Sequence, residues 1–138
     1  MALIEQWWPG RTGWTAIVMA CVAAISLADA AIAASPAYDG VYSGESTRTR
    51  GDESICGKSP NQVSYTVVNG QFSMIYDPAH HVGVNLVVQP DGSFSGDQAY
   101  IVGNHQSRVK ASGHIAGNVL TAQIEGDACA RSYQLTKH

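Results

Sequence analysis

The sequence predicts an all-β protein: a single small antiparallel up-and-down barrel of about eight strands, closed by one disulfide. Three observations lead to this prediction. Apolar and polar residues alternate with a period of two through most of residues 35–138, as they do in strands with one buried face. Asn-Gly and Asp-Gly pairs, which are strong signals of hairpin turns, separate the alternating segments. Two cysteines, Cys56 and Cys129, stand near the ends of this series.

Residues 14–34 have a different character, because they are almost wholly apolar. Arg11 precedes this run, and Ala31-Ile32-Ala33 supplies the small residues that a signal peptidase requires at its end. A positive residue, an apolar stretch and a small-x-small end are together typical of a secretory signal peptide. We therefore expect residues 1–34 to be removed on export, and residues 35–138 to form one domain that is periplasmic or secreted.

Two alternatives to a cleaved signal involve the membrane. A transmembrane anchor would need about 20 apolar residues, and Asp29 interrupts the run before that length is reached. The segment Val18-Met19-Ala20-Cys21 loosely resembles a bacterial lipoprotein box, which would leave the protein anchored through a lipidated Cys21. We favour cleavage near Ala33 or Ala34, after which no stable membrane insertion is expected.

Each expected strand is defined by its alternation and by the turns beside it. Four strands precede the Asp91-Gly92 turn; the first begins at Asp39-Gly40, and the second and third flank Asn69-Gly70. With the residues that mark one face of each, these strands are 39–49 (Tyr42), 62–70 (Val63, Tyr65, Val67), 71–77 (Phe72, Met74, Tyr76) and 82–89 (Val84, Leu86, Val88).

Four further strands follow the Asp91-Gly92 turn, and Gly117-Asn118 separates two of them. They are 93–102 (Phe94), 107–117 (Val109, Ala111, Gly113, Ile115), 118–126 (Leu120, Ala122, Ile124) and 128–137 (Cys129, Tyr133, Leu135). Since successive side chains of a strand point to opposite faces, the serines that follow Phe72 and Phe94 should face outward. We expect the inner face to bury Tyr42, Val67, Phe72, Leu86, Phe94, Ile115, Leu120, Ile124 and Leu135.

The closure of the barrel rests on the ends of the series. Consecutive antiparallel strands leave two open edges, and closure into a barrel removes both. If Cys21 leaves with the signal peptide, Cys56 and Cys129 remain, and in an oxidising compartment such a pair usually bridges. Cys56 follows the first strand and Cys129 begins the last, so a bridge would join neighbours. A two-sheet β-sandwich is the alternative, and we expect strands this short to enclose a filled interior.

Three motifs resemble those of a group of small, exported, largely uncharacterised bacterial proteins. They are Tyr38-Asp39-Gly40-Val41-Tyr42-Ser43-Gly44, Asp91-Gly92-Ser93-Phe94-Ser95-Gly96 and Cys129-x-x-x-Tyr133-x-Leu135. Members of this group have an N-terminal DG-x-aromatic-x-G strand and a Cys before a final aromatic-x-Leu strand. The resemblance covers residues 38–137 and implies export and a β-fold. It carries over no catalytic or binding residue.

The residue types that usually carry catalysis are scattered. The histidines show no zinc-ligand spacing, and no Gly-x-Ser-x-Gly nucleophile motif occurs. Asp97, Glu125 and Asp127 could form a carboxylate pair, but Glu125 and Asp127 flank Gly126 in an expected turn, where carboxylates usually make local hydrogen bonds. We therefore expect no enzyme, no metal and no cofactor, and the near-neutral charge balance of residues 35–138 argues against nucleic acid. The residues weighed are His80, His81, His105, His114, His138, Asp97, Glu125 and Asp127.

Arg131 is the one residue whose period places a charge on the inner face. One interpretation is that it extends to the barrel rim near the disulfide; the other is that it contacts an anion or ligand at the mouth. Residues 46–62 form the longest polar connection, and they are either a recognition loop or only a loop pinned by Cys56.

The functional prediction is a non-catalytic binding module that acts as a monomer on an unknown protein or small ligand. By analogy of fold alone, it is comparable with periplasmic inhibitors that block an enzyme cleft with their loops. The first alternative is a barrel that binds a small ligand, and the second is a hydrolase or metal-binding protein. A cavity above about 300 Å³ would favour the small-ligand alternative.

Overall fold

The computed structural model describes residues 33–138 of the chain. The predicted signal peptide therefore lies outside the described residues except for its last two, Ala33 and Ala34, and so does Cys21 with the predicted lipoprotein box. Within residues 33–138, no helix has the length and apolar character needed to cross a membrane.

The domain is all-β and antiparallel, as predicted. Its two short helical turns are η1 (Pro36–Tyr38) and α1 (Glu53–Cys56). All eight strands lie within a few residues of their expected bounds. The strands are β1 (Gly40–Arg50), β2 (Asn61–Val67), β3 (Gln71–Asp77), β4 (Val82–Val87), β5 (Ser93–Val102), β6 (His105–Ala116), β7 (Val119–Glu125) and β8 (Ala130–Lys137).

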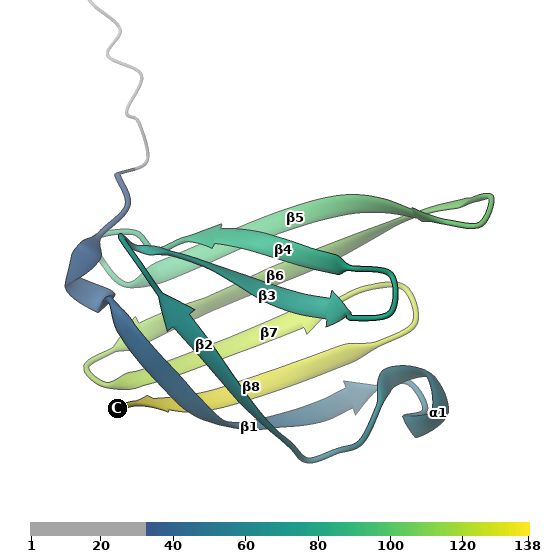
Figure 1. Cartoon of the computed structure of the whole chain (residues 1–138), viewed down its shortest axis with the longest axis horizontal. Helices are drawn as coiled ribbons and strands as arrows, with labels where there is room; N and C mark the ends of the chain where they lie inside the picture. The colour runs from purple at the N-terminus through teal and green to yellow at the C-terminus, as the bar shows by residue number, and fades with distance from the viewer. Residues whose placement is uncertain (1–32) are drawn as a thin grey trace, which may run out of the picture.

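Six strands form a curled half-barrel in the order β2-β1-β8-β7-β6-β5, and β3 and β4 form a separate hairpin (Figure 1). β1 and β8 pair, for example at Gly44 opposite Leu135. The prediction that the first and last strands are neighbours is therefore confirmed. Main-chain pairing is interrupted at two seams. β2 and β3 share one bridge, between Val68 and Gln71, and then separate; no ladder joins β4 to β5. The barrel is thus split where a closed one was expected.

The core lies between the half-barrel and the hairpin. All nine residues predicted to be buried are buried, and Ser73 and Ser95 face outward as expected. Phe72 of the hairpin meets Phe94 of β5 edge to face, with ring centroids 5.0 Å apart. Apolar contacts therefore attach the hairpin to the sheet where main-chain pairing does not.

The residues before β1 close one end of the molecule. The Asp39 carboxylate accepts hydrogen bonds from the backbone N–H groups of Asn69 and Gly70, each at 2.8 Å. The Tyr38 hydroxyl donates to the Pro90 carbonyl, and the Ser35 amide donates to the Val88 carbonyl. The β2–β3 and β4–β5 connections, which join the hairpin to the sheet, are thereby fixed at this end. We call it the closed end.

The opposite end holds the connection 51–60, the α1 turn and the predicted disulfide between Cys56 and Cys129 (Figure 1). The Cα atoms of the two cysteines are 5.6 Å apart, and the bond joins α1 to the residue just before β8. The tip of the β3–β4 hairpin, residues 78–81, lies at the same end. We call this the disulfide end.

Candidate functional site

A cavity of about 780 Å³ lies at the disulfide end, where β2 and β3 diverge. The expectation of a filled interior is therefore wrong for this half of the barrel, although side chains fill the closed end. The seam between β2 and β3 explains the difference. Beyond Val68 and Gln71 the two strands no longer share main-chain hydrogen bonds, so the space between them widens toward the hairpin tip.

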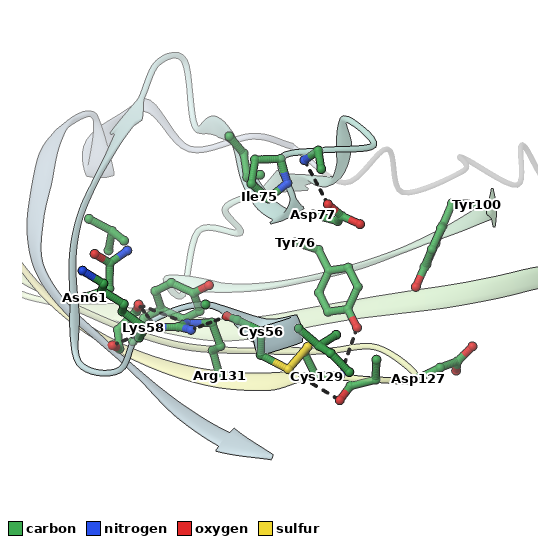
Figure 2. A pocket seen from close by; sticks show the side chains of 18 of the residues that line it. Cys56, Lys58, Asn61, Ile75, Tyr76, Asp77, Tyr100, Asp127, Cys129 and Arg131 are labelled. Atoms are coloured by element: carbon green, nitrogen blue, oxygen red, sulfur yellow. Dashed lines mark hydrogen bonds between the residues drawn. A yellow bond between two sulfur atoms is a disulfide. The ribbon is translucent and has the colours of Figure 1, made fainter. Parts of the chain in front are cut away.

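Four tyrosines from four strands wall the cavity: Tyr65 of β2, Tyr76 of β3, Tyr100 of β5 and Tyr133 of β8. They form two ring pairs. Tyr65 and Tyr133 have centroids 5.9 Å apart, and Tyr76 and Tyr100 have centroids 6.0 Å apart. Tyr76 extends toward the disulfide, and its hydroxyl accepts a hydrogen bond from the Cys129 amide at 3.1 Å (Figure 2).

The rest of the wall is mostly apolar. Val63 and Val102 contribute from β2 and β5, and the disulfide itself contributes sulfur surface. Ile55 of α1 and Ile75 of β3 stand at the rim with 70% and 55% of their surfaces exposed. Such a combination of apolar walls with a few polar groups is typical of sites for small organic molecules.

Arg131 lies on the cavity wall and holds the connection 51–60 in place (Figure 2). Its Nη1 donates to the Cys56 carbonyl at 2.9 Å, and its Nη2 donates to the Lys58 carbonyl at 2.8 Å. Its Nε and Nη2 also donate to the hydroxyl of Ser46, which is 1% exposed. Arg131 therefore lies near the disulfide at the end of the barrel, as one of the two interpretations expects. It does not simply extend toward solvent, because it donates hydrogen bonds to Ser46, Cys56 and Lys58.

Burial keeps the phenols of Tyr65 and Tyr133 neutral. Burial raises the pKa of Tyr65, and hydrogen bonds from Tyr133 and from the Ile75 backbone, together with the nearby Arg131, oppose the shift. The pKa of Tyr133 is also raised, by burial first and then by Tyr65, against a lowering effect of Arg131. Both hydroxyls are therefore protonated at physiological pH and can donate hydrogen bonds.

The histidines and carboxylates weighed from the sequence do not converge. Asp77 pairs with His80 at 2.6 Å within the hairpin tip, and this hydrogen bond lowers the pKa of Asp77. Asp97 pairs with Arg108, and Glu125 pairs with Arg50 at 3.2 Å. Of Asp97, Glu125 and Asp127, which the sequence offered as partners of a carboxylate pair, Asp127 alone lines the cavity. Within residues 33–138, no group of three or more His, Cys, Asp or Glu side chains could hold a metal ion.

The remaining histidines lie apart. His114 makes a 2.8 Å contact through Nε2 with the Asp91 carbonyl, at the closed end. His81 is exposed and takes a positive φ of 56° at the hairpin tip. With His80 it lines a second groove, of about 610 Å³, between the hairpin and the last residues of β5. His105 and His138 are exposed at a strand start and at the chain end.

Sequence reasoning found Arg131, Cys56 and Cys129 but not the tyrosine wall. Tyr65, Tyr76 and Tyr133 were expected only as residues on one face of their strands. Alternation placed these three tyrosines on the inner face, and nothing in the sequence marked part of that face as a cavity wall. The divergence of β2 and β3, which turns this face into a wall, has no local signal.

The motifs behind the family resemblance have structural roles in this fold. Asp39 caps the Asn69-Gly70 turn, Tyr42 and Phe94 are core residues, and Cys129 is in the disulfide. None of these roles names a ligand, so the argument about function rests on the cavity. The chain matches none of the protein-family models, curated proteins or solved structures with which it was compared.

Proposed function

We propose that the chain is an exported, non-catalytic binding protein that takes a small, largely apolar ligand into the cavity at the disulfide end. The single observation that carries this proposal is the cavity itself. Its volume of about 780 Å³ falls within the range of about 300–1,000 Å³ typical of small-molecule sites. Its tyrosine rings and aliphatic side chains offer a large contact area to an apolar body.

The predicted inhibitor-like role is less well supported. Such a role needs a loop that stands away from the scaffold and enters a cleft of the partner. Here the connection 51–60 folds back, because Arg131 binds the Cys56 and Lys58 carbonyls and the disulfide fixes Cys56. The connection therefore forms part of the cavity wall. Export is supported by the apolar run at 14–34 and by the disulfide, which is typical of oxidising compartments.

The test uses protein exported to the periplasm of a bacterial host and purified from it. All three tryptophans, Trp7, Trp8 and Trp14, lie in the expected signal peptide, so the processed domain has little emission of its own beyond 340 nm. N-phenyl-1-naphthylamine, a neutral dye that brightens in apolar surroundings, serves as the probe. We expect saturable binding of about one dye per chain.

Two serine variants of β6 locate the binding site. Ser107 is half-buried and lines the cavity, whereas Ser112 is exposed on the opposite face of the same strand. Ser107→Phe should place a ring in the cavity and weaken the fluorescence increase, and Ser112→Phe should leave it unchanged. Equal binding by both variants would place the dye elsewhere and overturn the proposal, as would the absence of saturable binding by the unaltered protein.

A further inference from the structure

The cavity has one polar corner, and its composition specifies part of the ligand. Tyr133 and Arg131 lie two residues apart on β8 and so share its inner face, and the curl of the sheet brings Tyr65 of β2 beside Tyr133. Arg131 lies close enough to both phenols to oppose the rise in their pKa values. Three hydrogen-bond donors therefore meet at one side of the cavity.

Among residues 33–138, no carboxylate forms an ion pair with Arg131. The groups that accept its hydrogen bonds are the Ser46 hydroxyl and the carbonyls of Ser46, Cys56 and Lys58, all of which are neutral. A guanidinium has five N–H groups, and these contacts leave one on Nη1 without a partner. Lys58 also lines the cavity, and neither cation forms an ion pair within residues 33–138.

The two phenols add hydroxyl groups on the same side of the cavity, because their rings lie 5.9 Å apart and both line it. Burial is the largest cause of the raised pKa of each, so both keep an O–H that can donate a hydrogen bond. A donor pair formed by a phenol and a guanidinium matches a carboxylate, whose two oxygens only accept hydrogen bonds.

The two carboxylates that line the cavity, Asp77 and Asp127, do not belong to β2 or β8, the strands that carry Tyr65, Arg131 and Tyr133. Asp77 is in the hairpin and is paired with His80. Asp127 lies in the turn before β8, and its carbonyl accepts a hydrogen bond from Arg50. Neither is bonded to Arg131, Tyr65 or Tyr133. The anionic end of a ligand would thus be attracted to the Arg131 corner, while its apolar body lies against Tyr76, Tyr100 and the aliphatic wall.

We propose that the ligand is an amphipathic carboxylic acid, with its carboxylate held by Arg131 and the Tyr65–Tyr133 pair and its aromatic or aliphatic body in the apolar part of the cavity. This inference rests on the proposed function, because it specifies the ligand of the same cavity. The corner selects for a carboxylate because a neutral group of the same shape would leave the Arg131 charge without a counter-ion.

The test compares 2-naphthoate with 2-naphthamide, which have nearly the same size and shape but differ in charge. Each is titrated into the processed protein near neutral pH, with binding followed by calorimetry. We expect naphthoate to bind at least about tenfold more tightly, as is typical for hydrogen bonds to a charged group. Equal affinities would overturn the inference while leaving the proposed function intact. Failure of both compounds and of the neutral dye would overturn the proposed function itself.

Three phenylalanine variants show whether the corner is responsible. Tyr65→Phe and Tyr133→Phe keep the rings and the fold, so each should weaken naphthoate by about tenfold while changing naphthamide by less than about twofold. Tyr38→Phe is the matched control and should change neither, because Tyr38 lies at the closed end, where its hydroxyl bonds the Pro90 carbonyl, and does not line the cavity. Loss of both ligands in equal proportion, or naphthoate binding that survives both corner substitutions, would contradict the assignment of the carboxylate to this corner.

Discussion

Phe72 and Phe94 show how single side chains hold the two parts of the domain together. Phe72 belongs to the β3–β4 hairpin and Phe94 to the six-stranded sheet, and the edge of one ring meets the face of the other. Both are buried, and a Cβ added at Gly113 would lie 2.4 Å from the Phe94 ring. Phe94 therefore packs directly against Gly113, and Phe72 packs against Phe94.

Phe94→Ala should lower the free energy of unfolding by about 3–5 kcal/mol, because the cavity left behind has no side chain to fill it. Ser95→Ala, one residue further along β5 and exposed, should change it by less than about 0.5 kcal/mol. Urea denaturation followed by far-ultraviolet circular dichroism measures both. If the two variants lose similar stability, the assignment of inner and outer faces is wrong.

Ser46 is the one buried polar side chain among residues 33–138, and it accepts from both Nε and Nη2 of Arg131. Ser46→Ala should cost about 1–3 kcal/mol, since it leaves donors of a charged group without an acceptor. Ser43→Ala is the control, because its hydroxyl bonds only the exposed hydroxyl of Ser64. Denaturation midpoints compare the two, and a Ser46 effect no larger than that of Ser43 would argue against this role for Arg131.

Among the elements, the strands could be predicted because their signals are local. Alternation marks β7 from Leu120 to Ile124, and Asn69-Gly70 supplies two consecutive positive φ angles, 52° and 69°, that a tight turn requires. The pairing of β1 with β8 followed from counting strands and placing two cysteines. The split between β2 and β3 could not be predicted. It arises because β2 pairs with β1 along its whole length and meets the β3 segment only at the Val68–Gln71 bridge, and no local pattern encodes this choice of partner.

The same limit applies to the site. Arg131 was noticed because a charge at an inner position breaks the alternation, whereas tyrosines fit the alternation and raise no question. These tyrosines line a cavity only because the hairpin leaves the sheet at that end. Lys58 lies in an irregular connection, where no periodicity applies.

The disulfide acts at the level of elements, since it links the α1 turn to the start of β8 across 73 residues of sequence. Reduction should lower the free energy of unfolding by roughly 4 kcal/mol, because the unfolded chain regains the freedom of a long loop. Circular dichroism should still show strands, as the turns and the core do not depend on the bond. Guanidinium titrations with and without reductant test this, and unchanged midpoints would contradict it.

At the scale of the whole molecule, the domain closes on its own N-terminal residues. Ser35 lies against Gly70 and donates to the Val88 carbonyl, so the segment just after the expected cleavage site is part of the fold. Processing near Ala33 or Ala34 would leave these contacts in place. Intact-mass measurement of exported protein should therefore give a chain that begins near Ala34 or Ser35. A mass that includes a diacylglyceryl group on Cys21 would establish the lipoprotein alternative instead.

The two seams have a consequence for how the cavity fills and empties. The β3–β4 hairpin is tied by hydrogen bonds at the closed end. At the disulfide end, apolar and tyrosine contacts and a hydrogen bond from the Cys129 amide to the Tyr76 hydroxyl attach it. It can swing outward without breaking a ladder of the six-stranded sheet, so its amide hydrogens should exchange with solvent sooner than those of β7 and β8. A bound ligand that bridges Tyr65, Tyr76 and Tyr133 would slow that exchange across the hairpin, far beyond the residues it touches.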